Sequence, residues 1–244
     1  MSNIVDTHQH SGRCRVFDAE VDPAAIVPVL DANGVSTALV MPFPGAPNAA
    51  AEHEQIAMLA AEYPGRIRGI VNMNPHLDGY EDEAARCVVE FGFVALKLHT
   101  VGHAVDPMNR DGQRVFAAAR ELEVPVIVHT GGVGEPFASP AHLLSAARDY
   151  PDLPIVLAHA GMSVATRQAG MVAEHCPNVY LEPSWCSVLD TRWLLDLVGP
   201  SRVMFGSDAL ENVPLELAKF RSLSLGEQEL AACLGDTATA VYKL

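Results

Sequence analysis

Two histidines near the start of the chain are the first residues whose types and spacing suggest chemistry. His8 and His10 lie in the stretch Asp6-Thr7-His8-Gln9-His10. Residues two apart on a β-strand point to the same face, so both imidazoles can project together. Neutral imidazole is a common ligand for zinc and related divalent metals. The pair is consistent with half of a metal site, although two ordinary hydrogen-bonded histidines would leave the same pattern.

Further polar residues close several short apolar runs downstream. They are Lys97 and His99 in Ala95-Leu-Lys-Leu-His99, His129 in Pro125-Val-Ile-Val-His129, His159 in Ile155-Val-Leu-Ala-His159, and Asp208 in Phe205-Gly-Ser-Asp208. Any one of these histidines could be a core residue with a satisfied hydrogen bond. Seven polar groups on one rim are harder to explain by packing, because burying so many without partners costs free energy. Together they predict a metal site.

Apolar runs alternate with helical patterns along the whole chain, and this alternation predicts the elements that position those residues. The expected strands are residues 3–8, 35–41, 67–73, 94–99, 125–129, 155–159, 179–182 and 202–208. The expected helices are residues 23–33, 49–62, 80–90, 113–121, 140–149, one ending near 176, then 189–198, 214–223 and 226–242.

Eight strands, each followed by a helix, predict an α/β protein with one (β/α)₈ TIM barrel over residues 1–244. An open doubly wound sheet also fits the alternation, but no G-x-G-x-x-G turn follows the first strand. In a barrel of this kind the active site forms at the C-terminal ends of the strands. The polar residues above fall at those ends.

The charge balance limits the expected partners. Lys and Arg number 16 against 30 Asp and Glu, which gives a formal charge of -14 and argues against nucleic acid or an anionic membrane as a partner. The 5 cysteines show no C-x-x-C pairing, and neither a secretory leader nor a membrane-spanning apolar run is evident. We expect a cytoplasmic protein that acts on a small molecule, with homo-oligomerisation left open.

The chain resembles the amidohydrolase superfamily, and within it the amidohydrolase-2 branch, which includes aminocarboxymuconate semialdehyde decarboxylase and several lactonases. The matching pieces are Asp6-Thr-His-Gln-His10, Ala95-Leu-Lys-Leu-His99, Val128-His-Thr-Gly131, Leu157-Ala-His-Ala-Gly161 and Phe205-Gly-Ser-Asp208. They occur in the family's order over nearly the whole chain.

The resemblance implies a mononuclear site with His8, His10, His129 and Asp208 around one divalent ion per chain, which we expect to be Zn²⁺. A metal of this kind lowers the pKa of its water to about 7. The resemblance also implies that His159 is the catalytic histidine beside that water. Asp208 would orient the water or accept its proton.

Lys97 has three interpretations. In binuclear members of the superfamily a carboxylated lysine from the fourth strand bridges two metals, and Lys97 occupies that strand. An unmodified ammonium would be repelled by a dication, so Lys97 could instead bind an anionic group of the substrate or form a structural ion pair. His99 shares its face and could support the site or line the pocket.

Other residues are weaker candidates for substrate binding. Arg13 and Arg15 follow the first strand, where a guanidinium could bind a substrate carboxylate or remain solvated. Trp185 follows a strand end, as do Glu182 and Phe43, and these three residues could line the pocket.

Three functions follow from these patterns. The first is a metal-dependent hydrolase that uses a metal-activated water on a small carboxylated lactone, amide or ester-like substrate. The second is a metal-dependent, non-oxidative decarboxylase of an unsaturated or aromatic carboxylic acid, because the resembling branch hosts both reactions. The third is a non-catalytic barrel that binds a small molecule, and the full set of metal and acid–base residues argues against it.

Overall fold

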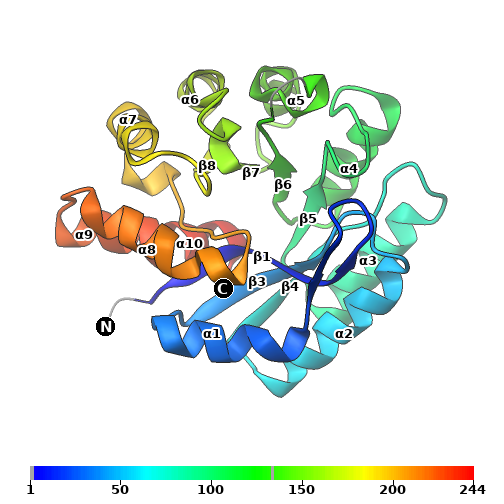
Figure 1. Cartoon of the computed structure of the whole chain (residues 1–244). Helices are drawn as coiled ribbons and strands as arrows, with labels where there is room; N and C mark the ends of the chain where they lie inside the picture. Colours follow the sequence, from blue (N-terminus) through cyan, green and yellow to red (C-terminus); the bar gives the residue numbers. More distant parts are fainter. Residues whose placement is uncertain (1–2, 133–134) are drawn as a thin grey trace.

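A ring of parallel strands enclosed by helices forms the framework of the chain (Figure 1). The computed structural model describes residues 3–132 and 135–244. The strands follow one another in the order β2-β1-β3-β4-β5-β6-β7-β8, and all neighbouring pairs except β1–β2 are parallel. Their bounds are β1 Val5–Cys14, β2 Ala19–Val21, β3 Thr37–Pro42, β4 Ile67–Val71, β5 Ala95–Leu98, β6 Val126–His129, β7 Ile155–Ala158 and β8 Val179–Glu182.

Helices follow the parallel strands and cover the outside of the ring (Figure 1). Their bounds are α1 Ile26–Asn33, α2 Ala49–Glu62, α3 Tyr80–Phe91, α4 Arg110–Glu121, α5 Leu143–Asp149, α6 Thr166–His175, α7 Val188–Val198, α8 Val213–Ser222, α9 Glu227–Ala231 and α10 Thr237–Tyr242. Within the described residues, no helix has the length and apolar character needed to cross a bilayer.

Side-chain caps explain where several helices begin. The side chains of Asn48, Asn109 and Ser187 accept hydrogen bonds from the first turns of α2, α4 and α7. The cap at Asn109 starts α4 three residues before the predicted position of 113. The predicted helix 226–242 is divided instead, because a π-helical turn at Ala232–Asp236 separates α9 from α10.

The predicted eighth strand is a short extended segment rather than a full strand. Residues 203–205 close the ring, with a single bridge between Val203 and Leu181 of β8. On one side Met204 N donates to Leu181 O at 2.9 Å, and on the other Thr7 N donates to Phe205 O at 3.1 Å. These bonds join β8 to β1 and confirm the (β/α)₈ barrel.

The first strand is longer than predicted and ends in a hairpin that the sequence did not reveal. β1 continues to Cys14, and β2 returns antiparallel to it with Arg13 opposite Glu20. The register of β1 against β3 shifts between Asp6 and Gln9, and such a bulge re-aims side chains. One continuous strand therefore carries His8 and His10 and then extends over the mouth of the barrel.

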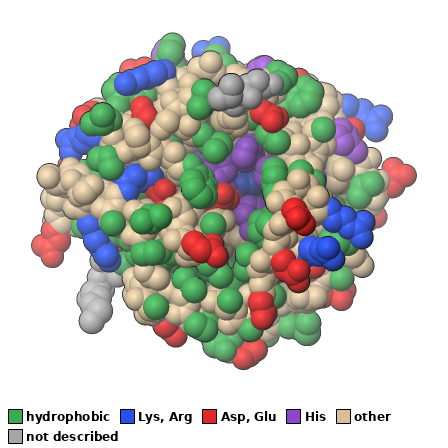
Figure 2. All heavy atoms as spheres, viewed as in Figure 1, with side chains coloured by type: hydrophobic (Ala, Val, Ile, Leu, Met, Phe, Trp, Pro, Cys, Tyr) green, Lys and Arg blue, Asp and Glu red, His purple; other side chains and the backbone are tan. Residues whose placement is uncertain are grey.

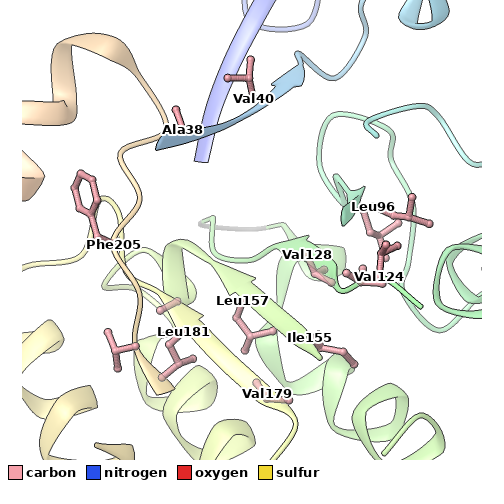
Figure 3. Packing of buried hydrophobic residues seen from close by; sticks show 14 of the residues in the cluster. Ala38, Val40, Leu96, Val124, Val128, Ile155, Leu157, Val179, Leu181 and Phe205 are labelled. Carbon is pink, nitrogen blue, oxygen red and sulfur yellow. The ribbon is translucent and has the colours of Figure 1, made fainter. Parts of the chain in front are cut away.

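Alternate residues along the strands pack into two separate apolar layers. One layer joins strands to helices and includes Ala38, Val40, Leu96, Val128, Leu157, Leu181 and Phe205 (Figure 3). The other fills the inside of the ring with residues such as Leu39, Ile70, Ala95, Ile127 and Val156, and α10 contributes Val241 and Tyr242 to it. The interior is thus a packed core, and side chains further along the strands can reach a site above it.

Candidate active site

Histidine side chains gather in a hollow at the centre of one face of the barrel (Figure 2). The inward alternation explains this position, because Lys97 lies two residues after Ala95 and His129 two residues after Ile127. A cavity of about 630 Å³ opens there. It is lined by His10, Phe17, Ala19, Glu20, Val21, Phe43, Pro44, His99, His129, His159, Met162, Trp185, Asp208, Ala209 and Glu211.

His10 and Asp208 line this hollow, and His8 lies fully buried beside them. His8 Nε2 lies 3.1 Å and His10 Nε2 3.4 Å from the same oxygen, Oδ1 of Asp208. His10 Nδ1 donates to the Pro42 carbonyl at 3.2 Å, and His8 Nδ1 donates to the Glu182 carboxylate at 2.9 Å. Since each imidazole carries its proton on Nδ1, both Nε2 atoms present lone pairs toward Asp208.

This arrangement fits a divalent cation. Two nitrogen lone pairs and a carboxylate oxygen at these separations repel one another unless positive charge lies among them. In a tetrahedral zinc site with bonds of about 2.0–2.1 Å, ligand atoms also lie about 3.3 Å apart. The outer hydrogen bonds to Glu182 and Pro42 are of the kind that fixes metal-binding histidines.

Lys97 is fully buried and lies against the same group. Its Nζ is 3.1 Å from His8 Nε2. Burial lowers the pKa of Lys97 to about 8, although the carboxylates of Asp208 and Glu182 oppose the shift. An ammonium would compete with a metal for the His8 lone pair, whereas a neutral amine or a carboxylated lysine would not. Neither Lys97 nor His8 is among the residues that line the cavity.

His159 stands beside His8, with ring centroids 4.9 Å apart. Its Nδ1 lies 2.8 Å from Ser184 Oγ, and that hydroxyl donates to Glu182 at 3.1 Å. Because the hydroxyl has only one proton, it must accept from His159 Nδ1. Nε2 of His159 is therefore free to accept a proton, as a general base requires.

His129 and His99 continue this row of rings along the cavity wall. Their rings stack at 4.4 Å, and His129 meets His159 edge-on at 4.8 Å. His129 Nδ1 has no hydrogen-bond partner among the described residues, whereas His99 Nδ1 accepts from Gly102 N at 3.0 Å. The ligand atoms that lie within 4.8 Å of one another include those of His8, His10 and Asp208 but not those of His129.

Burial keeps these imidazoles neutral. It lowers the pKa of His8, His99 and His129 well below the usual range, and that of His159 to about 3. Neutral imidazole is the form that binds metals. The site therefore offers lone pairs and one carboxylate at neutral pH.

The loop after β8 orients Asp208. Trp185 Nε1 donates to Asp208 Oδ2 at 2.8 Å, and Trp185 N donates to Glu216 Oε1 at 3.0 Å. The backbone of His159, Trp185 and Asp208 is left-handed, with φ of 65°, 64° and 67°. Side chains other than glycine rarely adopt this region, and such strain is concentrated at functional sites.

Asp6 ties β1 to the segment that carries Asp208. Its carboxylate accepts from Ser207 N at 3.0 Å and from Ser207 Oγ at 2.6 Å. Asp208 N in turn donates to His8 O at 2.7 Å. Burial raises the pKa of Asp6 to about 6. These bonds hold Asp208 and the two histidines of β1 in one unit.

Gly206 is required beside this unit. A Cβ at position 206 would lie 2.7 Å from the carboxyl carbon of Glu182, too close for any side chain. The small residues before Asp208 thus allow the segment to approach β8.

The structure does not bring Arg13 or Arg15 into the cavity. Both are exposed on the β1–β2 hairpin, and neither is among the residues that line the cavity. The hairpin instead contributes Phe17, Ala19 and Glu20 to the wall.

Glu182 and Ser184 have roles that the sequence did not reveal. Glu182 was expected as a pocket wall, but it is buried and accepts from His8, from Ser184 N at 2.6 Å and from Ser184 Oγ. The sequence does place the Glu182 carboxylate at an inward position of a buried strand. An ionised group buried there needs several hydrogen-bond donors, which could have indicated this role.

Removing the negative charge of Glu182 should weaken metal binding. In Glu182→Gln the shape is kept but the anionic acceptor for His8 Nδ1 is lost, and losses of this kind cost about 10–100-fold in metal affinity. Titrating metal-free protein with Zn²⁺ against a chromophoric chelator measures the dissociation constant. A folded variant with the parent's affinity would contradict this role.

A group of potential ligands outside the cavity, His53, Glu83 and Cys87, does not fit a metal. His53 Nδ1 donates to Glu83 Oε1 at 2.8 Å, and Arg86 donates to both oxygens of that carboxylate. Burial raises the pKa of the Cys87 thiol well above its usual range, so it stays protonated. This cluster is already satisfied by its own hydrogen bonds.

A family model described as "Amidohydrolase" (Amidohydro_2) matches residues 5–244. Comparison with curated proteins returned no significant match. Several solved structures share the fold at low sequence identity. One is 2,6-dihydroxybenzoate decarboxylase in complex with 2,6-dihydroxybenzoate, at 16% identity and a TM-score of 0.79, with 100% of both chains covered.

Two further structures extend the range of activities. Dihydroxybenzoic acid decarboxylase from Polaromonas sp. JS666, with bound manganese and the inhibitor 2-nitroresorcinol, is 18% identical with a TM-score of 0.78 and covers 100% of this chain and 98% of its own. A probable 2-pyrone-4,6-dicarboxylic acid hydrolase from Acinetobacter baumannii, with citric acid bound, is 13% identical with a TM-score of 0.74 and covers 99% and 100%.

Proposed function

The chain belongs to the amidohydrolase family, whose model matches residues 5–244, and it is an enzyme. From this premise we propose that it is a metal-dependent hydrolase of a small lactone, amide or ester-like substrate. The observation that carries the proposal is the convergence of two imidazole lone pairs on one oxygen of Asp208. We assign His8, His10, His129 and Asp208 as metal ligands and His159 as the catalytic histidine. The resident ion that we propose is zinc, because imidazole and carboxylate ligands suit it.

Asp208 and His159 would have different roles beside the ion. A divalent ion held here would lower the pKa of water and polarise a substrate carbonyl. Asp208 accepts the proton of the attacking water, with its second oxygen kept in place by Trp185. His159 has Nε2 free and borders the same cavity, so it can take up or return a proton at the leaving group.

The cavity limits the substrate. Its volume of about 630 Å³ is in the range of sites for small molecules. Among the lining residues that the structure describes there is no lysine or arginine, and the carboxylates are Glu20, Asp208 and Glu211. A single carboxylate on the substrate could reach the metal, but a second one would face glutamates. We therefore expect substrates with at most one carboxylate.

The second candidate is non-oxidative decarboxylation of an aromatic or unsaturated acid. The aromatic rings of the cavity wall favour it, because Phe43 stacks on His10 at 4.7 Å and Phe17 and Trp185 also border the cavity. A flat substrate ring could pack among these side chains. Its carboxylate would lie at the metal and leave as carbon dioxide, and Asp208 or His159 would pass a proton taken from water to the ring carbon that keeps the electron pair of the broken bond.

Turnover in ¹⁸O-labelled water separates the two reactions. Metal-loaded protein is incubated with matched panels of lactones, esters and amides and of aromatic and unsaturated monocarboxylic acids. A product that has gained water and carries the label supports hydrolysis. Release of carbon dioxide with no label in the remaining product would replace hydrolysis by decarboxylation. Turnover of neither panel by metal-loaded protein would contradict both.

We predict about one bound divalent ion per chain, because the two groups of converging ligands on this face, His8–His10–Asp208 and His8–His159–Glu182, share His8, and Glu182 already accepts a hydrogen bond from His8 Nδ1. Elemental analysis of purified protein measures the ratio. Mass spectrometry of the intact chain reports whether Lys97 carries a carboxyl group. Two ions per chain together with a carboxylated Lys97 would overturn the mononuclear assignment, and manganese in place of zinc would overturn the choice of ion.

A further inference from the structure

A line of four hydrogen bonds runs from the outside of the barrel to His10. Glu83 on α3 accepts from His53 Nδ1 on α2 at 2.8 Å. His53 Nε2 accepts from the backbone N of Asn72 at 3.1 Å. Asn72 Nδ2 donates to the Pro42 carbonyl at 2.7 Å, and the same carbonyl accepts from His10 Nδ1 at 3.2 Å. The line thus connects two helices to one imidazole of the site.

Each group in this line has its direction fixed by its neighbour. His53 must carry its proton on Nδ1 to donate to Glu83, so its Nε2 can accept from Asn72. The Pro42 carbonyl can only accept hydrogen bonds, so Asn72 Nδ2 and His10 Nδ1 must both be the donors. His53 and Asn72 are buried, which prevents water from replacing these partners.

Only one of the two polar atoms of the Asn72 side-chain amide, Nδ2, makes a hydrogen bond among the described residues. The side-chain oxygen Oδ1 is buried and has no hydrogen-bond partner among the described residues. Leaving a buried acceptor unpaired is unfavourable, and each such atom calls for an explanation. The bond from Nδ2 to Pro42 O, at 2.7 Å, offsets part of this cost.

We propose that Asn72 is a positioning residue for His10, acting through the Pro42 carbonyl, with His53 and Glu83 holding Asn72 in place. Asn72 touches neither the metal site nor the wall of the main cavity. Asn72 Nδ2 is a second donor to the same carbonyl oxygen, at 2.7 Å against 3.2 Å for His10 Nδ1, so it helps to hold that oxygen in place. The oxygen then fixes the proton of His10 on Nδ1 and leaves Nε2 for the metal. This inference rests on the proposed metal-dependent function.

A purely structural role is the alternative, and the chain offers a matched control. Asn178, at the N-terminal end of β8, also uses its side-chain amide to donate to main-chain carbonyls, those of Ala147, Tyr150 and Leu153, at 3.0, 2.9 and 3.0 Å. It lies at the opposite end of the barrel from the site. Its loss should destabilise the fold without changing the metal centre.

The test compares Asn72→Ala, Asn72→Asp and Asn178→Ala with the parent. Three quantities are measured: the dissociation constant for Zn²⁺ on metal-free protein, the Tm of metal-free protein, and the tautomer of His10 from ¹⁵N NMR. We expect both Asn72 variants to raise the dissociation constant about 10–100-fold and to move part of the His10 population to the Nε2–H tautomer. We expect Asn178→Ala to lower Tm and leave the other two quantities unchanged.

Asn72→Asp keeps the size of the side chain and exchanges the donor for an acceptor, so it remains informative if the alanine variant does not fold. Parent-like Zn²⁺ affinity in a folded Asn72 variant would overturn the positioning role. Equal weakening by Asn178→Ala would do the same, because it would trace the effect to general destabilisation. A parent protein that binds no divalent ion would instead refute the proposed function.

Discussion

Replacing Asp208 with asparagine should lower kcat by at least about 100-fold while the fold survives, because general-base steps contribute about 10²–10⁴-fold. The variant keeps the shape of the side chain and can still accept from Trp185 Nε1. It loses the charge that faces the two Nε2 lone pairs and the basicity that accepts a proton. The loss should appear in kcat more than in KM, because the proton moves only during the reaction.

The measurement is steady-state kinetics and metal content on the same purified sample. Three imidazoles remain in Asp208→Asn, so we expect a reduced but measurable metal content. Asp152→Asn, an exposed carboxylate outside the site, is the matched control and should retain the activity of the parent. A kcat within roughly tenfold of the parent would remove Asp208 from the mechanism.

Replacing either strand histidine with alanine should abolish tight metal binding, but the two variants should differ in stability. Each loses one imidazole, so the fall in affinity should exceed the 10–100-fold typical of an outer partner. His8→Ala also leaves Lys97 without its nitrogen acceptor and removes one donor from buried Glu182. Uncompensated buried polar groups cost about 1–3 kcal/mol, so we expect metal-free His8→Ala to be the less stable variant.

Thermal unfolding of the metal-free proteins and titration with Zn²⁺ test this pair of expectations. His175→Ala provides the control, because His175 is exposed on α6 and donates only to Met171 O of its own helix. If His8→Ala kept full metal content, the interpretation of the first strand would be wrong. Equal stability of the two variants would show that the buried carboxylate and ammonium find other partners.

Local patterns predicted the elements well, because each depends on nearby residues. The inward position of Lys97 and His129 follows from a period of two within their own strands. The sequence did not predict the β1–β2 hairpin, and it predicted a full strand where residues 203–205 form only one bridge to β8. Whether a segment becomes a strand depends on the partners that it finds elsewhere in the fold. The hydrophobic periodicity of a segment does not show how many backbone hydrogen bonds it will form with neighbouring strands.

The site was predicted as a set of residues but not as a network. The sequence indicates that His10 can face the cavity, but its tautomer depends on a carbonyl held by Asn72, 62 positions away. Similarly, the partners of Glu182 lie on β1, directly after β7 and on its own following loop. The exposure of Arg13 and Arg15 on the hairpin could not be predicted either, because a loop sequence has no periodicity that separates inward from outward side chains.

The left-handed backbone at His159, Trp185 and Asp208 has a consequence for evolution and engineering. Conformations of this kind cost about 1–3 kcal/mol each, and glycine would relieve most of that cost. A screen that rewards thermostability alone would therefore favour glycine or asparagine at these positions. The selected variants would be more stable but would lack the imidazole, the indole or the carboxylate of the site, so stability and activity are opposed at these three positions.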